Sequence, residues 1–163
     1  AESLLSNPQA MYSYTISNDL RPDQVAHLYY NDSELLWLIF LANNMVDPYY
    51  SWPLTQHQFQ DYINSKYSTI ANAKSNIKHY RYQEKKATDE NWTTIEIISK
   101  DTYDLNGTFS TLRTISNAQT QRYQAVTDYI YEEELNESKR NIKVIDRRLA
   151  GQAKNLLRDI MIG

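Results

Sequence analysis

The run Leu35–Ala42, with the sequence LLWLIFLA, is the densest apolar segment of the chain and limits most strongly what the chain can fold into. It is much shorter than the about 20 apolar residues that a membrane-spanning helix needs. A buried strand and a buried helix can both produce so short a run. Asp32-Ser33 before the run is typical of a helix N-terminus, and Asn43-Asn44 after it is typical of a helix end. The flanks therefore favour a helix.

This helix is apolar on nearly every side, so the rest of the fold must cover it on nearly every side. We therefore predict that it is the central core helix and that Trp37 and Leu38–Leu41 are mostly buried. An aromatic cluster of Tyr49, Tyr50 and Trp52 follows it, between two prolines. The cluster could contact another protein, stack on a sugar or plug the base of the core helix. The residues alone leave these three roles open.

The composition excludes several classes of function. The chain has 163 residues, enough for one domain or two small ones, and its 41% hydrophobic and 23% charged residues are typical of a soluble globular protein. A net charge of -3 argues against nucleic acid as a partner. Three glycines cannot build a glycine-rich phosphate loop, and a chain without cysteine has no disulfide or thiolate chemistry. Ala1–Ala10 lacks the apolar region of a secretory signal, and we predict no membrane association.

The first part of the chain reads as a strand followed by helices. Tyr12–Ser17 alternates Tyr or Ile with hydroxyl residues, which predicts a strand with one buried face. A proline opens the segment Pro22–Tyr30, and this suits the first turn of a helix. After the central helix, Thr55 and Gln58 fit a capping box and predict a helix that runs to about Tyr67.

The remainder of the chain combines strands and helices. We predict a linker or frayed helix at Ser68–Asn76, a hairpin of the strands Ile77–Gln83 and Thr93–Ser99, a helix at Tyr129–Arg140, a strand at Asn141–Ile145 and a last helix at Arg147–Met161. Asn106-Gly107, with Tyr103, Leu105 and Phe109 around it, is typical of a second hairpin. No structure is assigned to Thr108–Gln121.

The residue types that most often carry catalysis or bind metals form no recognisable site. His27, His57 and His79 do not have metal-ligand spacing, and no cysteine can complete such a site. Glu132–Glu134 could supply a carboxylate pair for glycoside hydrolysis. Adjacent carboxylates on a helix point in different directions, however, and fit a solvated helix start better. We therefore predict no enzyme activity, no cofactor, no metal site and no small-molecule substrate.

The segment Tyr14–Asp47 resembles a LysM module, which has a strand followed by two helices. The matching residues are Tyr29-Tyr30-Asn31-Asp32, Leu36-Trp37 and Ala42-Asn43. A LysM module usually closes with a Pro-Gly-Gln turn into a second strand. This chain instead has Pro53-Leu54-Thr55-Gln56, followed by a predicted helix. The resemblance implies one function, the binding of peptidoglycan or chitin.

The chain as a whole is similar to the baseplate wedge protein 53 family of contractile-tailed phages. The similar segments, in the same order along the chain, are Arg21-Pro22-Asp23, Leu35–Trp52, Trp52-Pro53-Leu54, Ile77–Tyr80 and Tyr131–Ile145. Members of this family are structural, carry a LysM-like module and help to join neighbouring wedges. This resemblance implies a baseplate subunit of the virion tail, assembled in the host cytoplasm, whose partners are other wedge proteins and neighbouring wedges.

Together these observations predict an α+β fold. A LysM-like strand-helix-helix module with its following helix is expected at residues 1–67, and a β-hairpin region with a C-terminal helix at residues 68–163. The predicted protein-interface residues are Tyr49, Tyr50, Trp52, Tyr80 and Tyr131. The alternative to a structural baseplate role is LysM-type glycan binding.

Overall fold

The computed structural model describes residues 10–17, 19–107, 113–116 and 119–162. The fold is α+β, as predicted, and the chain divides into two units. Unit 1 combines Ala1–Gln58 with Leu135–Gly163, and unit 2 consists of Phe59–Glu134. This division differs from the sequential one predicted at residue 67, because a strand near the C-terminus returns to pair with the first strand of the chain.

Among its described residues, unit 1 contains a two-stranded sheet and five whole helical segments, together with the first turn of α5 (Gln56–Tyr67) and the end of α8 (Asp128–Ser138). In chain order the whole elements are β1 (Met11–Thr15), α2 (Pro22–Tyr30), the 3-10 turn η2 (Ser33–Leu35), α3 (Leu36–Ala42), α4 (Pro48–Ser51), β6 (Asn141–Ile145) and α9 (Arg147–Ile162). The sequence order of strand, helix and helix that the LysM resemblance implies is thus present in β1, α2 and α3. The LysM assignment itself stays a prediction.

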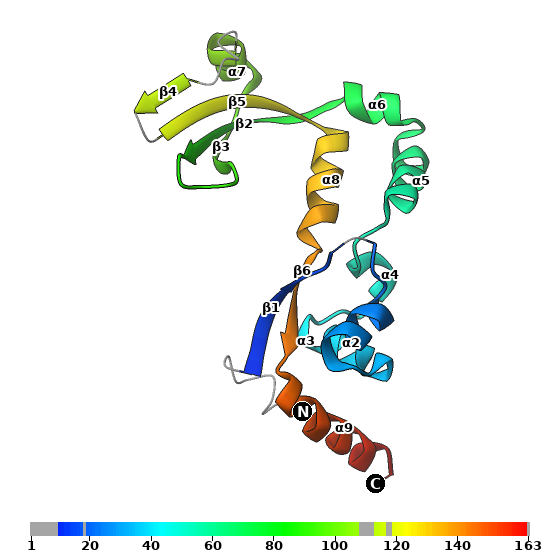
Figure 1. Cartoon of the computed structure of the whole chain (residues 1–163). Coiled ribbons are helices and arrows are strands. Elements are labelled where there is room, and N and C mark those ends of the chain that lie inside the picture. Colours follow the sequence, from blue (N-terminus) through cyan, green and yellow to red (C-terminus); the bar gives the residue numbers. More distant parts are fainter. Residues whose placement is uncertain (1–9, 18, 108–112, 117–118, 163) are drawn as a thin grey trace. The chain divides into compact units, whose positions relative to one another are not determined.

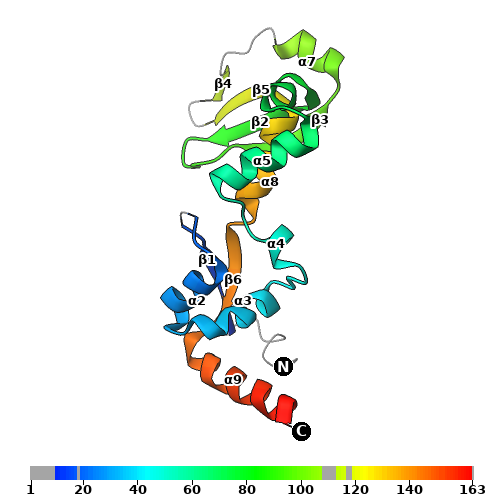
Figure 2. The ribbon, with the colours of Figure 1, turned by 90° about the vertical axis from the view of Figure 1, so that its right-hand side faces the viewer.

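The sheet of unit 1 joins segments from opposite ends of the chain. β1 and β6 pair antiparallel over their whole lengths without a shift in register. The helices α2 and α3 lie on the same side of this sheet (Figure 1, Figure 2). Because side chains alternate along a strand, Tyr14, Ile16 and Ile142 contribute to the core, whereas Ser13 and Thr15 are exposed. The predicted strand is therefore present, although it ends at Thr15, and Tyr12 of its predicted buried face is 48% exposed.

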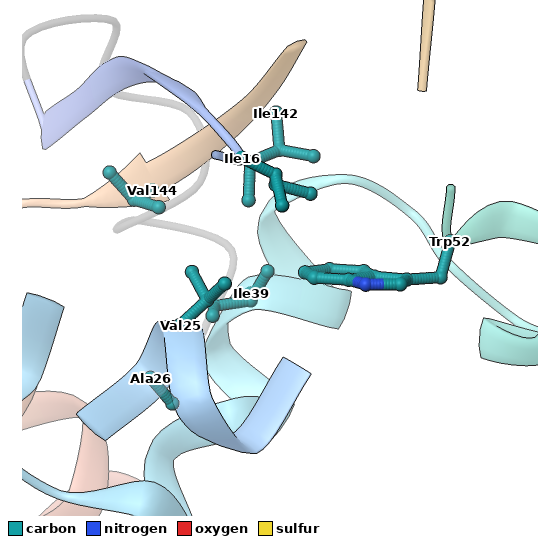
Figure 3. Close-up of a cluster of buried hydrophobic side chains, with 7 residues drawn as sticks. All are labelled: Ile16, Val25, Ala26, Ile39, Trp52, Ile142 and Val144. Carbon is teal, nitrogen blue, oxygen red and sulfur yellow. The ribbon is translucent and has the colours of Figure 1, made fainter. Parts of the chain in front are cut away.

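Two apolar clusters hold unit 1 together. The first joins the sheet, α2 and α3 to the segment after α4 (Figure 3), and its buried members are Ile16, Val25, Ala26, Ile39, Trp52, Ile142 and Val144. The second joins α3 to β6 and the first half of α9, and its buried members are Leu35, Leu38, Ala42, Ile145, Ala150 and Ala153. The central helix therefore contributes to both clusters, which confirms its predicted role in the core.

The prediction that Trp37 and Leu38–Leu41 are mostly buried agrees with the structure, although the cover over α3 is not complete. Leu38 and Ile39 are fully buried, Trp37 and Phe40 are half-buried and Leu41 is 37% exposed. The cover over α3 comes from β6, α2 and the start of α9, and among the described residues of the helix it is least complete at Leu41.

Unit 2 is built on a four-stranded antiparallel sheet with the strand order β3-β2-β5-β4. Its elements are most of α5 (Gln56–Tyr67), α6 (Ile70–Ser75), β2 (Ile77–Lys86), β3 (Thr93–Ile98), α7 (Lys100–Gly107), β4 (Arg113–Ser116), β5 (Gln119–Thr127) and most of α8 (Asp128–Ser138). The predicted hairpin of β2 and β3 is confirmed, and so are the helices α5, α8 and α9 and the strand β6. The capping box of α5 is present, because Thr55 and Gln58 exchange two hydrogen bonds.

One prediction in this unit is borne out in one of its two alternatives, and another is corrected. Of the linker or frayed helix predicted at residues 68–76, the structure has a short helix, α6, which begins at a Thr69 cap that accepts a hydrogen bond from the Asn72 N–H group. The predicted hairpin at Asn106-Gly107 is instead the end of α7. The side chain of Asn106 donates to the carbonyl of Thr102 one turn earlier, so the asparagine supports the helix. The nearby Phe109 lies outside the described residues.

The two faces of the unit 2 sheet differ in chemistry. The ring of Tyr80 packs on Tyr103 of α7, with 4.7 Å between the ring centres. The next residue of β2, Arg81, points to the opposite face and forms two hydrogen bonds of 2.8 and 2.6 Å with Glu134 of α8. Figure 1 shows α7 and α8 on opposite sides of the sheet.

Within the described residues, no helix combines the length and the apolar character needed to cross a membrane.

The burial pattern of α3 gives a test of the core. We expect Leu38→Ala to lower the free energy of unfolding by about 2–5 kcal/mol, because it opens a cavity in a fully buried cluster. Leu41→Ala, three residues further along the same helix, should cost clearly less, because Leu41 is already 37% exposed to water. Denaturant unfolding of both variants measures this difference. Equal losses of unfolding free energy for the two variants would contradict the burial described for α3.

Candidate protein-contact surface

Two neighbouring tyrosines project from unit 1 on the short helix α4. Tyr49 is 68% exposed and Tyr50 is 70% exposed. Their rings pack edge to face, with 5.2 Å between the ring centres and an angle of 87° between the planes. Val46, just before the helix, is also strongly exposed. We call Tyr49 and Tyr50 the tyrosine pair.

Local sequence fixes the backbone beneath the tyrosine pair. Asp47 is the N-cap of α4, and its Oδ1 atom accepts a hydrogen bond of 3.0 Å from the backbone N–H of Tyr49. Pro48 occupies the first helical position, where its fixed φ angle suits a helix and its missing N–H is not needed. The N–H of Trp52 closes the turn on the carbonyl of Pro48 at 3.0 Å. Asp47 and Pro48 therefore start α4, after α3 has ended at its C-cap residue Asn43.

Trp52 is the internal anchor of this segment and not part of its surface. Its side chain is only 8% exposed and lies against the first apolar cluster, beside Ile39 (Figure 3). Its indole Nε1–H donates a hydrogen bond of 2.8 Å to the carbonyl of Leu20. A buried indole needs such an acceptor, and here the chain supplies one. Of the three roles that the sequence left open for the cluster, Trp52 fits that of a structural plug in the core. Its role in protein contact stays a prediction.

A second set of contacts ties the segment to the end of α8 and the turn that follows it. The buried side chain of Asn136 accepts from the N–H of Leu54 at 2.7 Å and donates to its carbonyl at 3.0 Å. The Nζ atom of Lys139 donates to the carbonyl of Tyr50 at 2.7 Å. No local pattern in the sequence points to Asn136, because its partner lies 82 residues away.

The remaining predicted interface residues belong to unit 2 and have intramolecular partners. Tyr80 is half-buried against Tyr103, as described above. Tyr131 is also half-buried, and the ammonium group of Lys78 lies 4.2 Å from its ring centre. The structure thus brings Tyr49 and Tyr50 together on one surface, with Trp52 beneath them. The role of Tyr80 and Tyr131 in protein contact stays a prediction.

Two glutamates of the run in α8, Glu132 and Glu134, form hydrogen bonds and ion pairs within unit 2. Glu132 is 5% exposed, and its carboxylate accepts hydrogen bonds from Tyr62 at 3.0 Å, Lys66 at 2.8 Å and Tyr67 at 2.8 Å. Glu134 instead pairs with Arg81. The two carboxylates therefore serve separate networks. Among the described residues, no three His, Cys, Asp or Glu side chains lie close enough together to hold a metal ion.

The network around Glu132 keeps this carboxylate ionised. Burial by itself would raise the pKa of Glu132, but the hydrogen bonds from Lys66, Tyr67 and Tyr62 outweigh burial and hold the pKa below its ordinary value. Burial and the hydrogen bond to Glu132 raise the pKa of Tyr67 to about 12. A general acid or base needs a pKa near the working pH, and neither group has one.

The lowered pKa of Glu132 predicts how stability depends on pH. A carboxylate with a lower pKa in the folded state stabilises that state above its unfolded pKa of about 4.3, and this stabilisation is lost as the pH falls through the folded pKa. We expect Glu132→Gln to lower the free energy of unfolding at pH 7 by about 1–3 kcal/mol and to weaken its acid dependence.

Glu133 provides the matched control, since it is the next residue of the helix and is exposed. Glu133→Gln should change stability by no more than about 0.5 kcal/mol. Denaturant titrations at pH 7 and in the acid range compare the two variants. Identical curves for them would contradict the network described for Glu132.

Comparison with known proteins adds a family relationship to this geometry. The family model for base plate wedge protein 53 matches residues 5–158 of the chain. The baseplate wedge protein gp53 of Enterobacteria phage T4 is 29% identical over 58 residues. That alignment covers 36% of this chain and 30% of the phage T4 protein, so the match spans about a third of the length of this relative.

Proposed function

The chain belongs to the base plate wedge protein 53 family and is a structural component of a phage tail base plate, and we propose that it joins neighbouring wedge proteins during base plate assembly. The family relationship supports a structural role in the virion. The joining function goes further and is supported by the form of the tyrosine pair. The partners that we propose are other base plate wedge proteins.

The single observation that carries the proposal is the exposure of two tyrosines on a fixed backbone. An exposed aromatic side chain on an ordered helix loses little conformational freedom when it binds, since it has only two side-chain torsions. Tyr is also enriched among the residues that contribute most to binding at protein interfaces. Asp47, Lys139 and the buried Trp52 hold the segment in place before any partner arrives. The tyrosine pair is therefore suited to contact another protein.

Trp52 contributes to this proposal indirectly. Its ring is packed in unit 1 and its N–H group is already bonded, so it offers nothing to a partner directly. It fixes the position of the backbone two residues after Tyr50. Tyr80 and Tyr131 remain candidates for a separate contact of unit 2. The alternative of LysM-type glycan binding stays a prediction from the sequence.

The proposal predicts a separation of folding from assembly. We expect Tyr50→Ala to leave the melting temperature of the isolated chain unchanged, because the ring is exposed. The same change should weaken incorporation into base plates by about 2 kcal/mol or more, which is a roughly 30-fold loss of affinity. Both quantities are measured on one purified variant, by thermal unfolding and by recovery of the chain in assembled base plates.

Leu28→Ala is the matched control for this experiment. Leu28 is also an exposed apolar residue of unit 1, but it lies on α2 and outside the tyrosine pair. The control should assemble like the unmodified chain. If Tyr50→Ala assembled as well as Leu28→Ala, the tyrosine pair would not be the contact. A lower melting temperature for Tyr50→Ala would assign the ring a role in folding instead.

A further inference from the structure

The two-stranded sheet of unit 1 has two outer edges, and side chains close one of them. At β6, the Asn43 side chain donates to the carbonyl of Lys143 at 2.7 Å and accepts from its N–H at 2.8 Å. The hydroxyl of Tyr30 accepts from the N–H of Ile145 at 3.0 Å. These side chains occupy the positions that a further strand would take. The outward groups of Lys143 and the outward N–H of Ile145 are therefore bonded within the chain.

The hydrogen bonds at both ends of β1 show which of its backbone groups face away from β6. The carbonyl of Ala10 accepts from Asp146, and the N–H of Ile16 donates to Arg140, so the even-numbered residues point toward the β6 side. Backbone groups alternate along an antiparallel strand. The N–H and C=O groups of Met11, Ser13 and Thr15 therefore point outward from the other edge of the sheet. This agrees with β6, where Lys143 and Ile145, opposite Ser13 and Met11, also point outward.

Within the described residues, the outer edge of β1 carries no charge, proline, bulge or covering segment, which are features that protect many edge strands. Natural edge strands are shielded by charged residues, prolines, bulges or a covering segment. The sequence Met11–Thr15 contains neither a charge nor a proline, and its register with β6 has no shift. Within the described part of the chain, β1 pairs with β6 alone. Ser13 and Thr15 are small and exposed, so they leave the backbone accessible.

We propose that the outer edge of β1 binds an extended segment of another base plate protein, which adds a third strand to the sheet of unit 1. The outward N–H and C=O groups of Met11, Ser13 and Thr15 form the binding site. In strand addition, main-chain hydrogen bonds supply affinity and alternate side chains supply specificity. The nature of the partner protein rests on the base plate function proposed above.

The side chains beside this edge define the segment that fits it. On the face that carries the core, Tyr12 is 48% exposed and offers an aromatic surface to an apolar or aromatic side chain. On the opposite face, the exposed Lys143 of β6 stands across β1 from this edge, and the small Ser13 lies between them, so the long lysine side chain can reach a residue of an added strand. The described residues place no acidic side chain in an ion pair with Lys143. The added strand therefore carries an apolar residue on one face and an acidic residue on the other.

A proline at position 13 tests this site without breaking the sheet. Ser13→Pro removes only an outward N–H group, and edge strands tolerate proline where the N–H faces solvent. We expect the variant to melt like the unmodified chain. We also expect its amount in purified tails, made by phage that encode it, to fall about tenfold or more. Ser13→Ala is the matched control, because it removes the hydroxyl but keeps the N–H, and it should be incorporated normally.

The structure of unmodified tails provides a second measurement that does not depend on the folding of the variant. Cryo-electron microscopy should show a strand of another protein paired with β1. The inference is overturned if Ser13→Pro and Ser13→Ala are incorporated equally. It is also overturned if the map shows an open β1 edge, residues 1–9 of the same chain on it, or a second copy of the chain. Absence of the unmodified chain from tails would instead contradict the proposed base plate function.

Discussion

The pairing of β1 with β6 is the contact on which unit 1 depends. It joins residues 126 positions apart, as in the pair Thr15 and Asn141. The entropic cost of closing a loop rises only slowly with loop length, by about 0.6 kcal/mol for each doubling. The sequence of a whole folded unit can therefore be inserted between the two strands of one sheet. Once β6 is in place, Ile142 and Val144 complete the cluster around Ile39.

The same return of the chain also builds the surface that we assign to partner contact. Asn136 and Lys139, just before β6, hold the backbone of Leu54 and Tyr50. Within β6 itself, Lys143 bonds to Asn43 at the end of α3. Folding of the C-terminal part of unit 1 and positioning of the tyrosine pair are thus linked. A change that loosened β6 would affect assembly even where it did not touch a partner.

Local signals in the sequence predicted most of the helices and strands, but they could not predict how distant parts meet. The proline at the start of α2 and the capping box of α5 act within a few residues, so the sequence shows them directly. Asn106-Gly107 was predicted to form a hairpin turn, but these residues end α7 instead. The side chain of Asn106 stabilises that helix through its hydrogen bond to the carbonyl of Thr102. The sequence left the burial of Trp52 open, because the acceptor of its N–H group, the carbonyl of Leu20, lies 32 residues earlier.

Native-state hydrogen exchange on the full chain tests most directly whether β1 and β6 fold together with the central helix. The inward N–H groups of Tyr12 and Tyr14 report on the sheet, and those of Phe40–Ala42 report on α3. We expect both sets to open with the same free energy, because one cooperative unit contains them. Opening of the two strand amides at a free energy lower by about 2 kcal/mol or more, with α3 still protected, would contradict this account.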